Sequence, residues 1–198
     1  MANQSSRRLI TLSACTLLSA CISAPPTQFY VLEPLSGQPS SSTSAEKKRQ
    51  IGIGPVSIPT LLERKQIVTR LPDQSINIAE LHQWASPLKD NVAQVLTHNL
   101  AALQAGDLIR AYPWSAYGTV DYRIIIDIIR FDTVLERSVN LEANWTIMDE
   151  KNHTLLSNGR TKIEHPLDEP TYPSAANALS KILSEFSREL SLALDKIK

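Results

Sequence analysis

Hydrophobic residues recur every three or four positions in two segments, which is the spacing of one face of a helix. In the first segment we expect Ser86 to be the N-cap, Pro87 the first helical residue and Gly106 the stop. Its apolar stripe consists of Leu88, Val92, Val95, Leu96, Leu100 and Leu103. The second segment, 174–196, has an apolar stripe of Leu179, Ile182, Leu183, Phe186, Leu190, Ala193, Leu194 and Ile197. Its predicted polar side consists of Ser180, Ser184, Ser187, Arg188 and Ser191.

Three longer segments alternate between apolar and polar residues, as half-buried strands do. They cover 121–135, 138–148 and 154–164, and a turn at 149–152 joins the last two. One face carries Tyr122, Ile124, Ile126 and Ile128 with Val139, Leu141, Ala143, Trp145 and Ile147. The other face is predicted to be polar and wet at Asn140, Glu142, Asn144 and Thr146. We therefore expect an antiparallel meander.

Shorter extended segments precede and separate these elements. Residues 51–59 predict a strand with a bend or bulge at Pro55, and 29–32 and 108–112 predict short strands. Segments 63–71 and 75–79 could form a hairpin around a turn at 72–74.

A one-sided sheet and two one-sided helices have one economical arrangement, in which the apolar faces cover each other. We therefore expect an α+β, two-layer α/β sandwich with a mixed, largely antiparallel sheet and both helices on one face. The expected organisation is a leader at 1–20, a lipidated N-terminus and tether at 21–28, and a single domain at 29–198 with a serine-rich loop at 36–50.

The first 20 residues resemble a secretory signal peptide. Arg7 and Arg8 precede an apolar run at 9–18, which is too short to span a bilayer. The run ends in Leu18-Ser19-Ala20-Cys21, which resembles a bacterial lipobox, so Cys21 is the predicted lipidation site. A similar pattern ends at Cys15, but it leaves a shorter apolar run. The alternatives are an unmodified Cys21 or a disulfide between the two cysteines.

The amino-acid composition argues against several classes of function. Among the 198 residues, 20 basic and 20 acidic side chains cancel, and without Arg7 and Arg8 the balance is 18 to 20, so we expect no nucleic-acid partner. The four histidines lack metal-ligand spacing, and no nucleophile motif is present, so we expect neither an enzyme nor a cofactor. Carboxylates on the strands could pair for general acid–base catalysis, although their location on solvent-exposed strand faces is the simpler explanation. The charged run 46–49 could contact anionic lipid headgroups or be solvated.

Several segments together resemble the PqiC (YmbA) family of ABC-type transport auxiliary lipoproteins. They are the lipobox, 29–32, 51–59, 64–70, 84–88, 130–132 and 141–145. The family pattern often has Pro where Lys65 stands and an acidic residue where Ser86 stands.

This resemblance implies a lipoprotein on the periplasmic face of the outer membrane, with diacylglycerol and an N-acyl chain on Cys21. Ile22, in place of the Asp that retains many lipoproteins at the inner membrane, agrees with that destination. The implied role is that of a non-catalytic accessory in intermembrane lipid transport that supports envelope integrity. The implied partners are a PqiB-like MCE-domain protein and a PqiA-like integral inner-membrane protein, with room for a homo-oligomer or ring. The alternative is a structural envelope lipoprotein without a transport role.

The segment 61–84 is the expected partner-facing or self-association surface. It combines a charged turn with short extended runs, and Trp84 has no place on the helical stripe that begins at Leu88. Arg64, Arg70 and Trp84 are the candidate partner-binding residues, because arginines and aromatics dominate interface energetics. In the alternative interpretation, Trp84 packs over the start of the helix.

Overall fold

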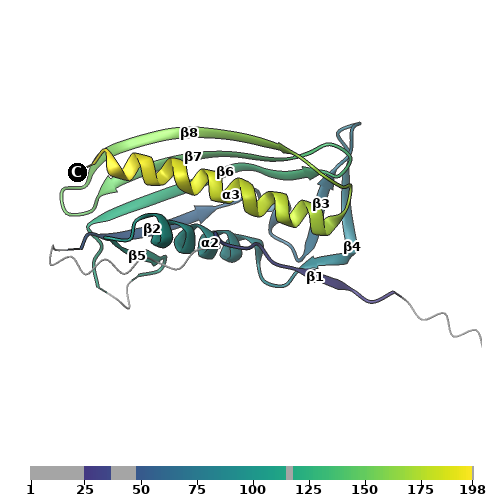
Figure 1. Cartoon of the computed structure of the whole chain (residues 1–198), viewed down its shortest axis with the longest axis horizontal. Helices are drawn as coiled ribbons and strands as arrows, with labels where there is room; N and C mark the ends of the chain where they lie inside the picture. The colour runs from purple at the N-terminus through teal and green to yellow at the C-terminus, as the bar shows by residue number, and fades with distance from the viewer. Residues whose placement is uncertain (1–24, 37–47, 115–117, 198) are drawn as a thin grey trace, which may run out of the picture.

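The computed structural model describes residues 25–36, 48–114 and 118–197, which form an eight-stranded sheet with two helices packed on one face (Figure 1). The strands are β1 (Gln28–Tyr30), β2 (Gln50–Ser57), β3 (Gln66–Arg70), β4 (Ile76–Trp84), β5 (Leu108–Ala111), β6 (Tyr122–Val134), β7 (Ser138–Asp149) and β8 (Thr154–Pro166). The helices are α2 (Leu88–Leu103) and α3 (Tyr172–Asp195), and a short 3₁₀ turn, η1, covers Thr60–Leu62. The predicted fold class is confirmed.

Strands β6, β7 and β8 form the predicted antiparallel meander. A register shift follows Ile128 in β6, so Phe131 is buried although it lies an odd number of positions beyond Ile128. Ile129 at the shift is exposed. The prediction that the polar face of β7 is exposed to solvent is wrong at Asn140, which is buried. There its side-chain amide donates a hydrogen bond to the carboxylate of Asp132 at 3.2 Å.

Strand β2 lies between β5 and β6 and runs parallel to both. The register between β2 and β6 shifts between Ile53 and Val56, which confirms the predicted irregularity at Pro55. Gly54 has a φ of 121°, which a side chain would strain. A Cβ on Gly52 would come within 2.8 Å of the Trp114 ring, so the glycine allows this ring to cover the outer face of β2.

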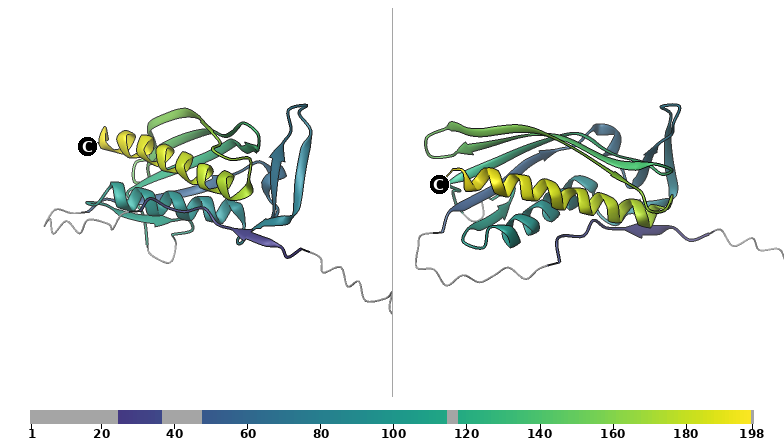
Figure 2. Two further views of the ribbon diagram at one scale, coloured as in Figure 1. Left: turned by 45° about the vertical axis from the view of Figure 1, so that its right-hand side comes forward. Right: turned by 45° about the horizontal axis from the view of Figure 1, so that its top comes forward.

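The predicted hairpin is confirmed as β3 and β4, but its second strand extends beyond the predicted 75–79. The antiparallel register jumps between Gln66 and Ile67, and the last residues of β4 pair with β1 in parallel. The hairpin joins β6 through Thr69 and Thr133. In both views of Figure 2 it stands at one end of the molecule, away from the body of the sheet.

Both helices begin one or more residues away from the predicted starts. Pro87, with an extended ψ of 126°, is the N-cap of α2, so Ser86 lies before the cap and the prediction for Ser86 is wrong. In α3 the hydroxyl of Thr171 accepts a hydrogen bond from the backbone N–H of Ser174 at 3.3 Å.

The predicted polar side of α3 is wrong at its four serines. Ser180, Ser184, Ser187 and Ser191 are all buried, whereas the prediction placed them in solvent. Ser187 accepts a hydrogen bond from Asn99 of α2 at 3.1 Å, and Ser191 accepts one from Gln104 at 2.8 Å. The serines therefore form part of the contact between the two helices.

Candidate functional site

The predicted lipidation site, Cys21, lies outside the described residues, as do the leader and most of the serine-rich segment. The first residue that the structure describes is Pro25, three residues before β1. The other predicted site residues all lie on or beside the β3–β4 hairpin, and the structure places each of them.

Arg70 at the end of β3 belongs to a cluster of charges centred on Asp132. The Nε atoms of Arg70 and Arg130 donate to Oδ2 of Asp132 at 3.2 and 2.8 Å, and Asn140 donates to the other carboxylate oxygen. Asp132 raises the pKa of Arg130 through its hydrogen bond. Two guanidinium groups thus share one buried carboxylate on the outer face of the sheet, and Glu142 and Glu164 lie near enough to add to the raised pKa of Arg130.

A shallow apolar groove of about 80 Å³ adjoins this cluster. Leu61 and Ile129 line it and are both exposed, while Arg70 and Arg130 stand at its margin. This combination of exposed aliphatic and arginine side chains is typical of a protein-binding surface.

The structure separates the two remaining candidates. Arg64 is half-buried, and its Nε donates to the backbone carbonyl of Leu61 at 2.9 Å, next to the groove. Trp84 is 6% exposed and belongs to the hydrophobic core together with Leu88. Its side chain offers almost no surface to a partner, as the packing alternative expected.

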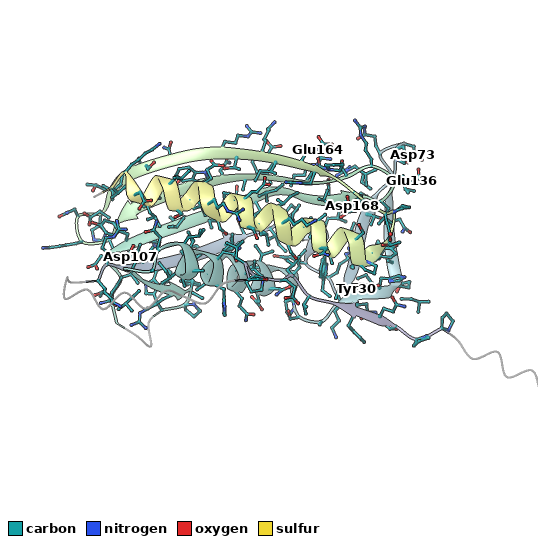
Figure 3. The ribbon with its side chains drawn as sticks, viewed as in Figure 1. Tyr30, Asp73, Asp107, Glu136, Glu164 and Asp168 are labelled. Atoms are coloured by element: carbon teal, nitrogen blue, oxygen red, sulfur yellow. The ribbon has the colours of Figure 1, made fainter. Side chains whose placement is uncertain are left out.

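An aromatic cluster fixes β1 to the hairpin and to α3. The Tyr30 hydroxyl lies 2.7 Å from Nδ1 of His82 and donates to Gln28, and His82 stacks on Tyr172 with ring centroids 4.0 Å apart. Burial raises the pKa of Tyr30, with a smaller contribution from Tyr172. Figure 3 shows Tyr30 at the hairpin end of the molecule and Asp107 at the opposite end.

The segment after β1 is held by side chains of both helices. The backbone N–H groups of Leu32 and Leu35 donate to Asn91 and Asn99 of α2, each at 2.7 Å, and the N–H of Glu33 donates to Ser180 of α3 at 3.0 Å. The sequence did not predict this clamp, because its only signal was two asparagines within a helix. The clamp fixes the chain that follows the predicted tether.

A larger cavity of about 740 Å³ lies at the opposite end, between the loop after β5 and the turn between β7 and β8. Its lining includes Trp114, His153 and an ion pair between Arg123 and Glu150 with an N···O distance of 2.9 Å. Within the described ranges, no group of three or more His, Cys, Asp or Glu side chains is placed to bind a metal. Neither described helix has an apolar stretch long enough to cross a bilayer.

The structure is therefore an α+β domain whose candidate binding residues lie on its surface. A sequence model of the family described as "ABC-type transport auxiliary lipoprotein component" matches residues 30–191, from β1 into α3. The chain therefore belongs to this family, which consists of auxiliary transport components rather than enzymes.

Known relatives agree with this assignment. The chain is 23% identical to the intermembrane transport lipoprotein PqiC of Escherichia coli over 139 residues, which cover 70% of this chain and 72% of the relative. PqiC of Shigella flexneri gives the same values.

Two crystal structures share the fold. An uncharacterized protein superposes with a TM-score of 0.72 at 17% identity, covering 86% of this chain and 99% of its own. A protein from Xanthomonas campestris gives 0.66 at 15% identity, covering 83% and 93%.

Proposed function

We propose that this chain is an outer-membrane lipoprotein and a non-catalytic accessory component of an MCE-type intermembrane lipid transport system that supports envelope integrity. The observation that carries the proposal is the family match over residues 30–191, together with a lipobox immediately upstream. The related protein of Escherichia coli is named as an intermembrane transport lipoprotein.

The membrane half of the proposal depends on Cys21. Diacylglycerol on its thiol and an N-acyl chain on its amine would supply more than the two membrane signals that stable anchoring requires. Ile22 next to the lipidated residue supports delivery to the outer membrane. The domain then faces the periplasm from a short tether.

The partner half of the proposal concerns the hairpin. Its outer face would contact a PqiB-like MCE-domain protein through the groove and through Arg64 and Arg70, while a PqiA-like protein forms the inner-membrane part of the system. The partly exposed arginines around Asp132 suit a partner surface that carries carboxylates. Crosslinking in cells followed by purification distinguishes the two roles. A transport accessory should co-purify with an MCE-domain protein, whereas a structural envelope lipoprotein should not.

The lipid anchor is tested by metabolic labelling with palmitate. We expect the wild type and Cys15→Ser to incorporate label and Cys21→Ser to lose it, because only Cys21 follows an apolar run of adequate length. The Cys21→Ser variant should also leave the outer-membrane fraction. Label that persists in Cys21→Ser and vanishes in Cys15→Ser would contradict the assigned site.

A further inference from the structure

An exposed apolar patch lies at the first strand of the domain. Phe29 is 65% exposed, Val31 47% and Leu81 40%. Large hydrophobic side chains at such exposure are costly when they gather on one surface, and such patches mark interaction sites.

The strand register fixes the side of Phe29. Phe29 lies opposite Gln83 in the parallel pair of β1 and β4, on the face opposite Tyr30 and Trp84. Val31 follows β1 directly, and Leu81 lies on β4 two residues before Gln83, next to the register shift. Tyr30 and His82 point the other way, where His82 stacks on Tyr172 of α3. Phe29 therefore faces away from the helix layer, and the exposed Val31 and Leu81 adjoin it along the chain and on the neighbouring strand.

The patch is also close to the predicted lipid site along the chain. Phe29 lies eight positions after Cys21, so the two lie within about 28 Å of each other even in a fully extended chain. Pro25 and Pro26 restrict the conformations of this tether further. By comparison, α3 alone is 24 residues long, or about 36 Å.

No charged residue occurs between Cys21 and Glu33. The tether and β1 can therefore approach a lipid surface without removing a charge from water. Anchoring also keeps the patch at a high effective concentration beside the bilayer, so even a weak apolar contact would be occupied.

We propose that Phe29, Val31 and Leu81 form a membrane-seating patch that inserts into the lipid surface beside the acyl chains and fixes the orientation of the domain. This inference rests on the proposed anchor at Cys21. The anchor supplies attachment, and the patch supplies a second contact that prevents the domain from swivelling on its tether. The hairpin, which shares β4 with the patch, then lies next to the membrane surface.

The test places an environment-sensitive fluorophore at single cysteines in the full chain. The variants are Phe29→Cys, Leu81→Cys and the control Leu192→Cys, whose native leucine is 63% exposed on α3. Processing at Cys21 removes Cys15, so the introduced thiol is the only one free for nitrobenzoxadiazole. The lipidated protein is reconstituted into vesicles of phosphatidylethanolamine and phosphatidylglycerol, with and without a spin-labelled phosphatidylcholine as quencher.

We expect the labels at 29 and 81 to shift to the blue and to lose most of their intensity in quencher-containing vesicles, while the label at 192 keeps both its wavelength and its intensity. Flotation of the protein with the vesicles but no quenching at 29 and 81 would overturn the patch and leave the anchor standing. A blue shift that is insensitive to the lipid quencher would assign the patch to a protein contact, such as a second copy, and also overturn it. Failure to float would overturn the anchor and the patch together.

Discussion

Asp132 is the residue on which the charged cluster of the hairpin depends. We expect Asp132→Ala to lower the free energy of unfolding by about 2 kcal/mol, because it leaves the Asn140 amide buried without its acceptor and two guanidinium groups without a counter-charge. Arg70→Ala should cost only about 0.5 kcal/mol, because Asp132 keeps Arg130 and Asn140 and the Arg70 pair is partly solvated. Urea denaturation measures both values. Equal losses would show that Asp132 contributes nothing beyond its pair with Arg70 and would contradict this expectation.

Glu142 on β7 makes stability depend on pH. Hydrogen bonding to Arg160 lowers the pKa of Glu142 from its ordinary value of 4.5, with further contributions from the charges of Arg160 and Lys162. A carboxylate whose pKa is lower in the folded state stabilises the fold above its unfolded pKa, and this contribution is lost as the pH falls through the folded pKa. We therefore expect the wild type to be more stable than Glu142→Gln above pH 4.5, and the difference to vanish in acid. A pH-independent difference in urea midpoints would contradict this assignment.

Residue patterns proposed Arg64 and Arg70 for one surface because both occur in a short charged segment, and this role stays a prediction. The groove that Arg70 lines depends on Ile129 and Asp132 of a distant strand, which no local pattern could predict. Trp84 was ambiguous for a related reason. A tryptophan beside a helix start suits an interface or a core equally well, and only its burial in the folded core decides between them.

At the scale of elements, strand and helix periodicity predicted the meander and both helices. It failed on the serines of α3 because a serine in a helix can satisfy its own hydroxyl. Ser180, Ser184 and Ser187 each donate to the carbonyl four residues earlier, at 2.8, 3.0 and 2.7 Å. Their polarity is thus hidden, and their small size lets α2 approach. A polar face of serines therefore does not imply a solvent-facing side.

The buried stripe of α3 is tested by two substitutions on the same helix. Phe186 is fully buried, so Phe186→Asp places an unpaired carboxylate in the core and should cost about 4 kcal/mol or more, enough to unfold the domain. The control Leu192→Asp is on the exposed side and should change stability by less than about 0.5 kcal/mol. Circular dichroism and thermal melting compare them. A Phe186→Asp variant that melts with the wild type would show that this stripe is not core.

At the scale of the whole molecule, the proposed functional features concentrate at one end. The first described strand, the hairpin and the Asp132 cluster lie there, while Asp107 and the larger cavity lie at the other end (Figures 1 and 3). Sequence order could not predict this arrangement, because β1 pairs with the end of β4 across more than 50 intervening residues. With the proposed anchor at Cys21, a transport partner that reaches the membrane would meet the domain at this end.

Crosslinking mass spectrometry in intact cells tests this central claim most directly. Lys65 is exposed at the base of the hairpin, whereas Lys151 is exposed at the opposite end, so the two lysines report on different surfaces. We expect crosslinks from Lys65 to an MCE-domain protein, and their loss in an Arg64→Ala/Arg70→Ala variant that melts like the wild type. Recovery of no MCE-domain protein, or crosslinks to it from Lys151 alone that persist in the double variant, would contradict a partner surface on the hairpin.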